Sequence, residues 1–343
     1  MCEHCLSAVL TTWQLERFCE QFGVKPTELE ANFRGWRKHV ILGKDMAFLF
    51  PRTPQFLKEF RRELALYEAF AHVESLPLPR LIRRVKDKAI SYYEFGVVTR
   101  LSGVPFSQFI ESVSYDQFER LLLRLVEMIT LWHGIPRGEL PAVLPVRPGA
   151  VLRRTTMDNW HKQALNVEAT EDAVDFIYRL LQRLSHPRVP GVLADKTATK
   201  QKWVAIIGEL ARLPAVLVHG DVHEESFLVD PPSRDITGIL DWEVARLDNP
   251  VWDFNFGEWG LGICRWFDSF PSLRRRMWQR YLEIRGISLS TLEGLHLFYT
   301  LWEIIWLLLK RKERPVIEIT GTDYPAAVRI YLDELNRVTA SLA

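Results

Sequence analysis

The chain has 343 residues, 48% of them apolar, so it can bury a large core, and its length favours two lobes or domains over one. Its 44 Lys and Arg residues nearly balance its 43 Asp and Glu residues, and no basic tail or stripe argues for a nucleic-acid partner. The longest strongly apolar run near the carboxyl end, residues 304–309, is far too short to cross a bilayer.

The amino terminus lacks a signal-peptide pattern, so we expect a cytoplasmic protein. Four cysteines in a chain of this length give no disulfide framework, and reduced thiols are expected. Cys2-Glu3-His4-Cys5 has the spacing of half a zinc site, but no second Cys or His pair lies nearby. We therefore expect a frayed terminus rather than a structural zinc.

The amino-terminal third is expected to mix helices and strands. Apolar periodicity predicts helices at residues 11–22 and 26–33, ahead of the first strands. Strands are predicted near residues 38–42, 46–50, 80–85, 90–94 and 96–101, with an amphipathic helix that carries Glu63 among them.

From residue 103 onwards the chain is expected to be mostly helical. Residues 115–131 have helical apolar spacing and end at the stop signal Trp132-His133-Gly134. Further helices are predicted near residues 170–185, 197–212, 270–285, 291–311 and 323–341. A short hairpin interrupts them: residues 226–229 are strand-like, Pro231-Pro232 makes the turn, and residues 237–240 return.

Two carboxylates beside this hairpin favour phosphoryl transfer. Asp221 lies in His219-Gly220-Asp221, before the first strand, and Asp241 ends the second strand, so the hairpin would bring both to one side of a cleft. One carboxylate can orient and deprotonate an attacking hydroxyl, while the other holds magnesium against nucleotide phosphates. The alternative makes Asp221 a turn residue, Asp241 a helix cap and His219 a core histidine, and the joint spacing argues against it.

The block from His219 to Glu243 resembles the catalytic segment of the aminoglycoside phosphotransferase and choline kinase-like superfamily, relatives of protein kinases. The resemblance implies an α+β, bilobal protein-kinase-like fold. Residues 1–102 would form a small mixed nucleotide-binding N-lobe with an antiparallel sheet and a helical prelude at residues 1–33. Residues 103–343 would form a larger, mostly helical catalytic and substrate-binding C-lobe.

The same resemblance implies roles for individual residues. Asp221 would be the base or orienter of the hydroxyl, His219 would position its loop, and Asp241 would be the principal magnesium ligand. Ser226 stands where the family has an asparagine ligand, so it would be a weaker second ligand. Asp253 matches a downstream acid that braces the catalytic loop.

Residues 35–52 resemble the strand, turn and strand that open these phosphotransferases, with one consequential change. Leu49 stands where the family keeps the basic residue that grips the α- and β-phosphates, and a leucine cannot neutralise phosphate charge. Arg37, Lys38 and Arg52 are the candidates to replace it. We hypothesise that Arg37 or Lys38 reaches down from the turn above the phosphates; the alternative is that both are solvated surface charges.

Glu63 fits the family's helix glutamate that pairs with the strand cation. With Leu49 opposite, its expected partner is Arg52 or a cation of the loop, and the alternative is a plain surface acid. Residues 95–103 resemble the hinge between lobes, and backbone groups near Val98 to Arg100 are expected to read the adenine edge.

Together these residues predict an ATP- and Mg²⁺-dependent phosphotransferase that moves the γ-phosphate to a hydroxyl of a small molecule, with an antibiotic-type, choline-like or sugar acceptor. The alternative is a kinase-like protein that binds nucleotide or metabolite without turnover, because Leu49 and Ser226 alter two contacts at once. A metallohydrolase built on His219, Asp221 and His223 would need more ligands downstream than the sequence offers. The sequence leaves the oligomeric state open.

Overall fold

The computed structural model describes residues 6–32, 35, 37–110, 113–146, 201–205, 208, 210, 212–254, 269–288, 296, 300 and 324–341. The chain divides into two compact units, which contain residues 1–106, 136–145 and 225–245 and residues 107–135, 146–224 and 246–343. The sequence predicts one functional boundary after residue 102, and that boundary stays a prediction.

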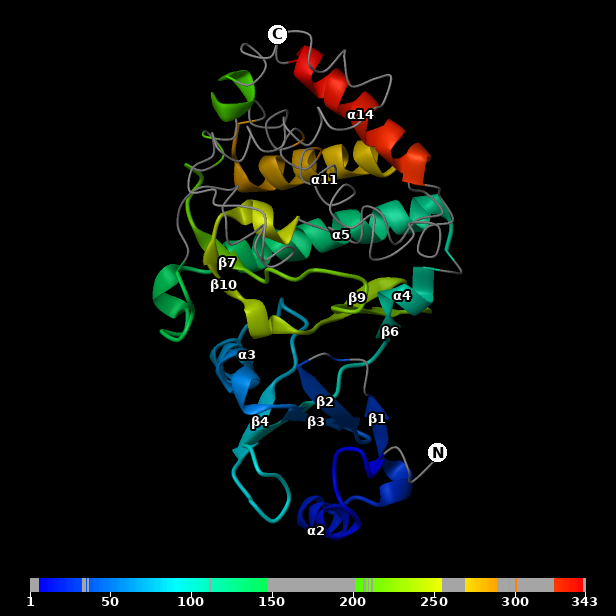
Figure 1. Ribbon diagram of the computed structural model, residues 1–343, viewed down its shortest axis with the longest axis vertical. Helices are drawn as coiled ribbons and strands as arrows, with labels where there is room; N and C mark the ends of the chain where they lie inside the picture. Colours follow the sequence, from blue (N-terminus) through cyan, green and yellow to red (C-terminus); the bar gives the residue numbers. More distant parts are fainter. Residues whose placement is uncertain are drawn as a thin grey trace. The chain divides into compact units, whose positions relative to one another are not determined.

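An antiparallel sheet of five strands forms the centre of the first unit (Figure 1). Its strand order is β1-β2-β3-β5-β4, with bounds Glu30–Asn32 (β1), Lys38–Leu42 (β2), Met46–Pro51 (β3), Leu81–Val85 (β4) and Phe95–Thr99 (β5). The strands predicted near residues 38–42, 46–50, 80–85 and 96–101 are therefore confirmed, each to within two residues.

One face of this sheet packs against α2 (Thr12–Phe22). Opposite residues of an antiparallel pair share a face, so Ile41 of β2 and Phe48 of β3 point the same way. The fully buried Phe18 of α2 meets Phe48 edge-on, with ring centroids 4.6 Å apart. Thr11 starts α2 with a capping box, and Gly23 ends it in the left-handed conformation.

The other face of the sheet packs against α3 (Leu57–Ala69). Val40 of β2 and Leu49 of β3 point to this face, and Gly96 of β5 lies opposite Leu49. A Cβ atom on Gly96 would lie 2.6 Å from Leu64 of α3, so only a glycine lets the helix approach the sheet this closely.

Two predicted elements are wrong. The helix predicted at residues 26–33 is a single 3₁₀ turn, η1 (Pro26–Glu28), followed by β1, because residues 30–32 find ladder partners at residues 40–42 of β2. The strand predicted at residues 90–94 is a turn, because Asp87 accepts hydrogen bonds from the backbone N–H groups of Ala89, Ile90 and Ser91. The apolar side chain of Ile90 is buried in the core cluster that also contains Ile41 and Phe48 of the sheet.

The predicted hairpin is confirmed and forms part of a second, three-stranded sheet in the first unit. Its strands are β8 (Phe227–Asp230) and β9 (Asp235–Ile239), and β6 (Val104–Pro105) adds to β8 in the order β6-β8-β9. Gly103 precedes β6 with φ of 108°, a conformation that L side chains rarely adopt.

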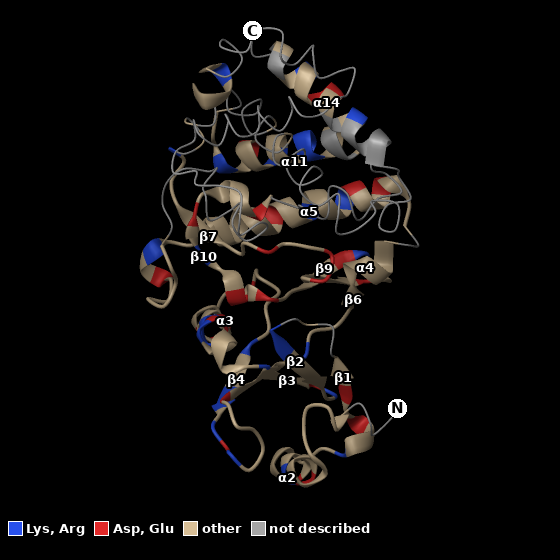
Figure 2. Cartoon of the chain, in the orientation of Figure 1, with Lys and Arg blue, Asp and Glu red and all other residues tan. Residues whose placement is uncertain are grey.

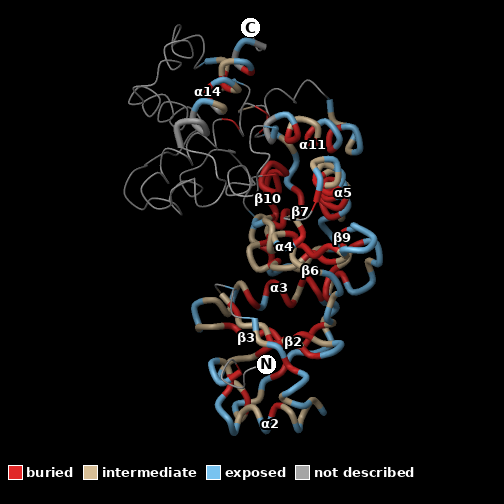
Figure 3. Tube along the Cα trace, turned by 90° about the vertical axis from the view of Figure 1, so that its right-hand side faces the viewer, coloured by how far each residue is buried: buried red, intermediate tan, exposed pale blue. Residues whose placement is uncertain are grey.

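The second unit is built mainly from helices. They are α5 (Tyr115–His133), α11 (Phe270–Arg285) and α14 (Tyr324–Ser341); along the chain, the boundary between the units falls within α4 (Phe106–Phe109). The unit also contains a short antiparallel pair, β7 (Val216–Val218) and β10 (Arg246–Asp248), and the 3₁₀ turn η6 (Pro250–Asp253). Buried and exposed stretches alternate along α5 (Figure 3), as its helical apolar spacing requires.

The helices predicted at residues 115–131, 270–285 and 323–341 are confirmed. Residues 201–205, 208 and 210 are helical, within the helix predicted at residues 197–212. The helix predicted at residues 170–185 and the Cys2 to Cys5 segment lie outside the described residues, as does most of the helix predicted at residues 291–311. Within the described part of the chain, no helix is both long enough and apolar enough to span a membrane.

Candidate active site

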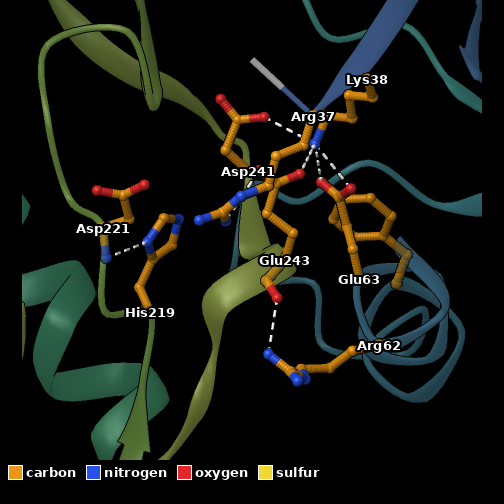
Figure 4. Close-up of polar contacts among 9 residues, drawn as sticks. Arg37, Lys38, Arg62, Glu63, His219, Asp221, Asp241 and Glu243 are labelled. Carbon is orange, nitrogen blue, oxygen red and sulfur yellow. Dashed lines mark hydrogen bonds and ion pairs between the residues drawn. The ribbon is translucent and has the colours of Figure 1, made fainter. Parts of the chain in front are cut away.

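The first unit gathers three carboxylates around one buried lysine (Figure 4). Lys38 is the first residue of β2, and its Nζ donates to both carboxylate oxygens of Glu63 at 2.7 Å. The same Nζ lies 2.8 Å from Asp241 Oδ1 and 3.1 Å from Glu243 Oε2. Glu63 therefore pairs with a cation of the neighbouring strand β2, although Leu49 occupies the expected position on β3.

Burial and charge act together on this cluster. Burial alone would lower the pKa of Lys38, but the carboxylates of Asp241, Glu63 and Glu243 hold that pKa well above its ordinary value. Burial raises the pKa of Glu63 to about 7, against the opposing effect of the Lys38 ammonium. Tyr67 stands one turn further along α3 and donates its hydroxyl to Glu63 Oε1 at 2.8 Å, which fixes the carboxylate against the helix.

Asp241 is aimed by a sharp change of backbone direction at the end of the hairpin. Leu240 N–H donates to the Ser226 carbonyl at 2.7 Å, which continues the pairing of β8 and β9. Asp241 then adopts φ 64° and ψ 46°, a left-handed conformation that Asp tolerates better than most residues. The 3₁₀ turn η5 (Trp242–Val244) follows, and the fully buried Trp242 anchors it. This arrangement brings Asp241 and Glu243 to the same ammonium.

Two arginines contact Glu243 of this cluster, and a third, Arg52, acts on His39 of the neighbouring strand position. Arg37 Nη1 lies 3.3 Å from Glu243 Oε1, and its side chain is 29% exposed. Arg62 donates to the Glu243 carbonyl at 2.8 Å. Arg52 lowers the pKa of His39 in addition to the effect of burial, and His39 points to the sheet face opposite that of Lys38. Figure 2 shows the blue of Lys and Arg residues at β2, the strand that begins with Lys38.

The expected adenine-reading segment lies at the end of β5. Val98 is buried and paired with Ala47 of β3. The N–H groups of Thr99 and Arg100 donate to the carbonyls of Arg80 and Asp45, at 3.0 Å and 2.9 Å. An adenine contact in this segment would therefore use carbonyl oxygens, or groups further along the chain, and that role stays a prediction.

In the second unit, Asp253 collects four donors around one buried carboxylate. Its oxygens accept from Trp132 Nε1 at 2.6 Å, from His133 Nε2 at 2.9 Å, and from the backbone N–H groups of His219 and Gly220 at 3.0 Å and 2.7 Å. Burial would raise the pKa of Asp253, but these donors, His133 first, hold it below its ordinary value. A carboxylate so placed fixes the loop that carries Asp221.

That loop is held from its inner side. His219 is fully buried, and its Nδ1 accepts the backbone N–H of Asp221 at 3.3 Å. Gly220 has φ of 80°, which turns the chain between them. Asp221 itself is exposed. Because Asp221 belongs to the second unit and Asp241 to the first, the expectation that both face one cleft stays a prediction.

Sequence reasoning overlooked several of these groups. Glu243 follows Asp241 by two residues, and the sequence alone does not show that its carboxylate binds Lys38 and Arg37. The sequence pattern marks Trp132 and His133 only as a helix end, whereas both bind Asp253, which lies 121 and 120 residues further along the chain. Only a fold can bring such distant positions together.

The residues at the end of the hairpin fit a magnesium ion chemically. Mg²⁺ prefers oxygen ligands, and Asp241, Ser226 and Glu243 supply carboxylate and hydroxyl oxygens. One oxygen each from Glu63, Asp241 and Glu243 lie within 4.8 Å of one another. Ser226 is buried immediately before β8, and its carbonyl accepts the N–H of Leu240.

Two curated proteins resemble parts of the chain. An uncharacterised protein of Bacillus subtilis, YcbJ, is 28% identical over 100 residues, which are 28% of this chain and 32% of that protein. Mouse acyl-CoA dehydrogenase family member 10 is 20% identical over 240 residues, which are 69% of this chain and 19% of that protein. The chain thus spans at most a third of the length of these relatives.

Solved structures match over nearly the whole chain. A GDP complex of an aminoglycoside 2′-phosphotransferase-IIIa variant covers 96% of this chain and 98% of its own, with a TM-score of 0.57 and 19% identity. A GDP and kanamycin complex of a related phosphotransferase covers 95% and 98%, with a TM-score of 0.53 and 17% identity. These matches establish an aminoglycoside phosphotransferase-like, protein-kinase-like fold.

The model of one protein family, described as the phosphotransferase enzyme family, matches residues 31–295. This range contains the Lys38 cluster, the hairpin and the braced Asp221 loop, and it is well over half of the chain. The chain therefore belongs to the phosphotransferase enzyme family.

Proposed function

We propose that the protein is an ATP- and Mg²⁺-dependent phosphotransferase that moves the γ-phosphate to a hydroxyl of a small molecule. The observation that carries the proposal is the cluster of Lys38, Glu63 and Asp241, a buried ammonium held by a helix glutamate beside a candidate metal ligand. Family membership supports phosphoryl transfer as the reaction class.

The braced loop suits Asp221 to act on the acceptor. Its carboxylate is exposed, whereas its backbone is held by His219 and, through Gly220, by Asp253. A carboxylate on a fixed loop can orient a hydroxyl and accept its proton as the phosphoryl group leaves. When bound at Asp241 and Ser226, magnesium would neutralise charge on the nucleotide phosphates.

The acceptor is a small molecule with a hydroxyl group, of the antibiotic, choline or sugar type. Solved relatives have been described with kanamycin and with streptomycin and ATP. Some are GDP complexes, so both ATP and GTP belong in any test of the donor. We expect the reaction to take place in the cytoplasm.

The proposal is tested with the purified chain, magnesium, ATP or GTP, and a panel of aminoglycosides, macrolides, amino alcohols and sugars. Release of nucleoside diphosphate above the acceptor-free rate is the expected result. Asp221→Asn should lower kcat by about 10²–10⁴-fold while nucleotide affinity changes little, because it removes a proton acceptor and no phosphate contact. Asp241→Asn should weaken binding of the magnesium nucleotide itself.

A second candidate is a kinase-like protein that binds nucleotide or metabolite without turnover. Leu49 and Ser226 favour it, because both replace groups that the family uses for phosphate or metal. Nucleotide binding by calorimetry, with no diphosphate released across the whole panel, would support this candidate. Turnover that disappears in Asp221→Asn would exclude it.

A further inference from the structure

The register of β2 and β3 puts Lys38 on the same face of the sheet as Leu49, the position at which the family has a cation. Val40 lies opposite Leu49, and Lys38 lies opposite Pro51 two residues further along the ladder. Opposite residues share a face and alternate residues of one strand return to it, so Lys38 and Leu49 both face α3. A side chain at either position is directed towards the helix that carries Glu63.

The Lys38 ammonium has one hydrogen fewer than the number of carboxylate oxygens in contact with it. Its Nζ lies within 3.1 Å of four carboxylate oxygens, from Glu63, Asp241 and Glu243. An ammonium carries three hydrogens, so these oxygens compete for them. If Asp241 turns its oxygen to a cation of its own, three oxygens remain for the three hydrogens. When Glu63 then accepts through only one of its two oxygens, one hydrogen of Lys38 is left for another acceptor, while Glu63 and Glu243 keep the ammonium in place.

From this geometry we infer that Lys38 of β2 binds the nucleotide phosphates in place of a cation at Leu49 of β3, and that Glu63 and Glu243 position it for that contact. This inference rests on the proposed function, because it needs a phosphate ligand at the Asp241 site. It assigns the cation to a single side chain and gives Glu243 a role as a positioning residue.

The two other candidates are less well placed. Arg37 is partly exposed, and its ion pair with Glu243, at 3.3 Å, is longer than each contact of Lys38 with Glu63. Arg52 contributes to the lowered pKa of His39, whose side chain lies on the face of β2 opposite that of Lys38. A bound phosphate beside Asp241 would meet the Lys38 ammonium, since those two groups already lie 2.8 Å apart.

The first test measures the affinity of magnesium with a non-hydrolysable ATP analogue by calorimetry. Lys38→Met should weaken binding roughly tenfold to hundredfold, the effect of one lost charge-assisted hydrogen bond. Lys44→Met is the matched control, because Lys44 is an exposed lysine in the turn between β2 and β3. Unchanged affinity in a folded Lys38→Met protein overturns the inference.

The second variant moves the ammonium instead of removing it. Lys38→Met combined with Leu49→Lys keeps one lysine on the face towards α3, so the buried carboxylates retain a cation. This variant should bind the analogue within about tenfold of the unaltered chain, because the ammonium reaches the same acidic cluster. A folded double variant that binds no better than Lys38→Met overturns the inference.

A third measurement needs no substitution. An adenosine analogue with a sulfonyl fluoride in place of the phosphates reacts with a nearby amine at alkaline pH; an S–N bond forms, and fluoride and a proton leave. Mass spectrometry should locate the label on Lys38, and magnesium with ATP should block it. A blockable label on another lysine overturns the inference even if the variants do not fold.

Failure of the inference and failure of the proposed function are distinguishable. If the unaltered chain binds no magnesium nucleotide, the proposed function fails and the inference fails with it. If the unaltered chain binds and turns over the nucleotide but Lys38 is neither labelled nor needed, only the inference fails. Glu243→Gln adds a separate readout: weaker analogue binding, with the Lys38 label reduced, is the result expected of a positioning residue.

Discussion

Asp253 shows how one side chain can hold a loop that it does not belong to. The carboxylate is fully buried and accepts from two side chains of α5 and from two backbone N–H groups of the Asp221 loop. His133 is itself fixed, because its Nδ1 lies 2.8 Å from the Tyr281 hydroxyl of α11. Three parts of the second unit are therefore tied to one charge.

Replacing that charge tests its importance directly. Asp253→Asn presents an amide NH₂ where one carboxylate oxygen now accepts hydrogen bonds, so at least one buried donor loses its partner. We expect a loss of about 3 kcal/mol in the free energy of unfolding, the scale of buried hydrogen bonds to a charged group. Urea denaturation measures it, with the exposed Asp45→Asn of the β2–β3 turn as control. Equal stabilities would contradict the bracing role.

His296 provides a pH-dependent test in the second unit. It is buried and bound to Glu334 of α14, and burial lowers the pKa of His296 to about 4. The unfolded chain takes up this proton near the ordinary pKa of 6.5, before the folded protein does. Stability from His296 is therefore present above pH 6.5 and is lost as pH falls towards about 4, by roughly 3 kcal/mol in all.

The measurement compares urea denaturation curves at several pH values between these limits. His296→Gln should show a shallower loss of stability towards acid than the unaltered chain, because glutamine binds no proton. His72→Gln serves as control, since His72 is exposed in the turn after α3. Identical pH profiles for the His296 variant and the unaltered chain would show that this histidine does not contribute.

At the level of single residues, sequence reasoning succeeded where the chemistry is local. Asp241 and Asp221 stand out because each follows an apolar run, and the structure places both at such ends. The choice among Arg37, Lys38 and Arg52 could not be made from sequence. It depends on which face of the sheet each residue is directed to, and that is set by the register between β2 and β3, which no local pattern reveals.

Among the described glycines, Gly103, in the turn before β6, has the shortest contact for an added Cβ atom. Gly103 combines φ of 108° with a close approach to β8 and β9; a Cβ atom there would lie 2.8 Å from the Val229 carbonyl oxygen and 2.5 Å from Thr237 Oγ1. Thr237 also donates to the Ser102 carbonyl at 2.7 Å, which ties the turn to β9. The end of the expected hinge segment is thus fastened to the hairpin that carries Asp241.

Gly103→Ala should separate β6 from that hairpin. The strained φ and the clash with a backbone oxygen together should cost about 2–4 kcal/mol of unfolding free energy. Gly138→Ala is a suitable control, because nothing lies within 4 Å of a Cβ atom there. Differential scanning calorimetry of both variants decides the matter; a Gly103→Ala midpoint as high as that of Gly138→Ala would contradict the packing argument.

Element prediction worked for long periodic segments and failed for short ones. The helix from Tyr115 to His133 has five turns of consistent apolar spacing, a signal that tertiary context rarely overrides. Residues 30–32 have too few side chains to show any period, and they form a strand only because β2 offers an edge to pair with. Ile90 has the opposite effect: it is a buried apolar residue in a turn, and its apolar character predicts a strand that the structure does not contain at this place.

For the whole molecule, the two compact units exchange segments along the chain. The first unit takes residues 225–245 from a region that lies far beyond its amino-terminal part. Asp241 and Glu243 come from that segment and hold Lys38, while Ile239 N–H donates to the Pro77 carbonyl at 2.8 Å. The amino-terminal part therefore depends on a hairpin encoded in the carboxyl-terminal two-thirds.

This interleaving predicts how fragments behave. Residues 1–102 expressed alone would lack the hairpin, so Lys38 and Glu63 would lose two carboxylates and the cover of Trp242. We expect this fragment to show no cooperative thermal transition by circular dichroism, in contrast to the full chain. The same fragment joined by a short linker to residues 225–245 should regain one. A sharp transition in the fragment alone would contradict the prediction.

The ladder between β2 and β3 also bears on how such chains are compared. The position of a side chain in a sheet is better described by the face to which it points, and by its place along the strand, than by which strand carries it. Neighbouring strands offer equivalent positions on one face. A search for active family members that inspects a sequence alignment only at the position of Leu49 would classify this chain as inactive. The column of Lys38, on the adjoining strand, carries an ammonium that faces the same helix.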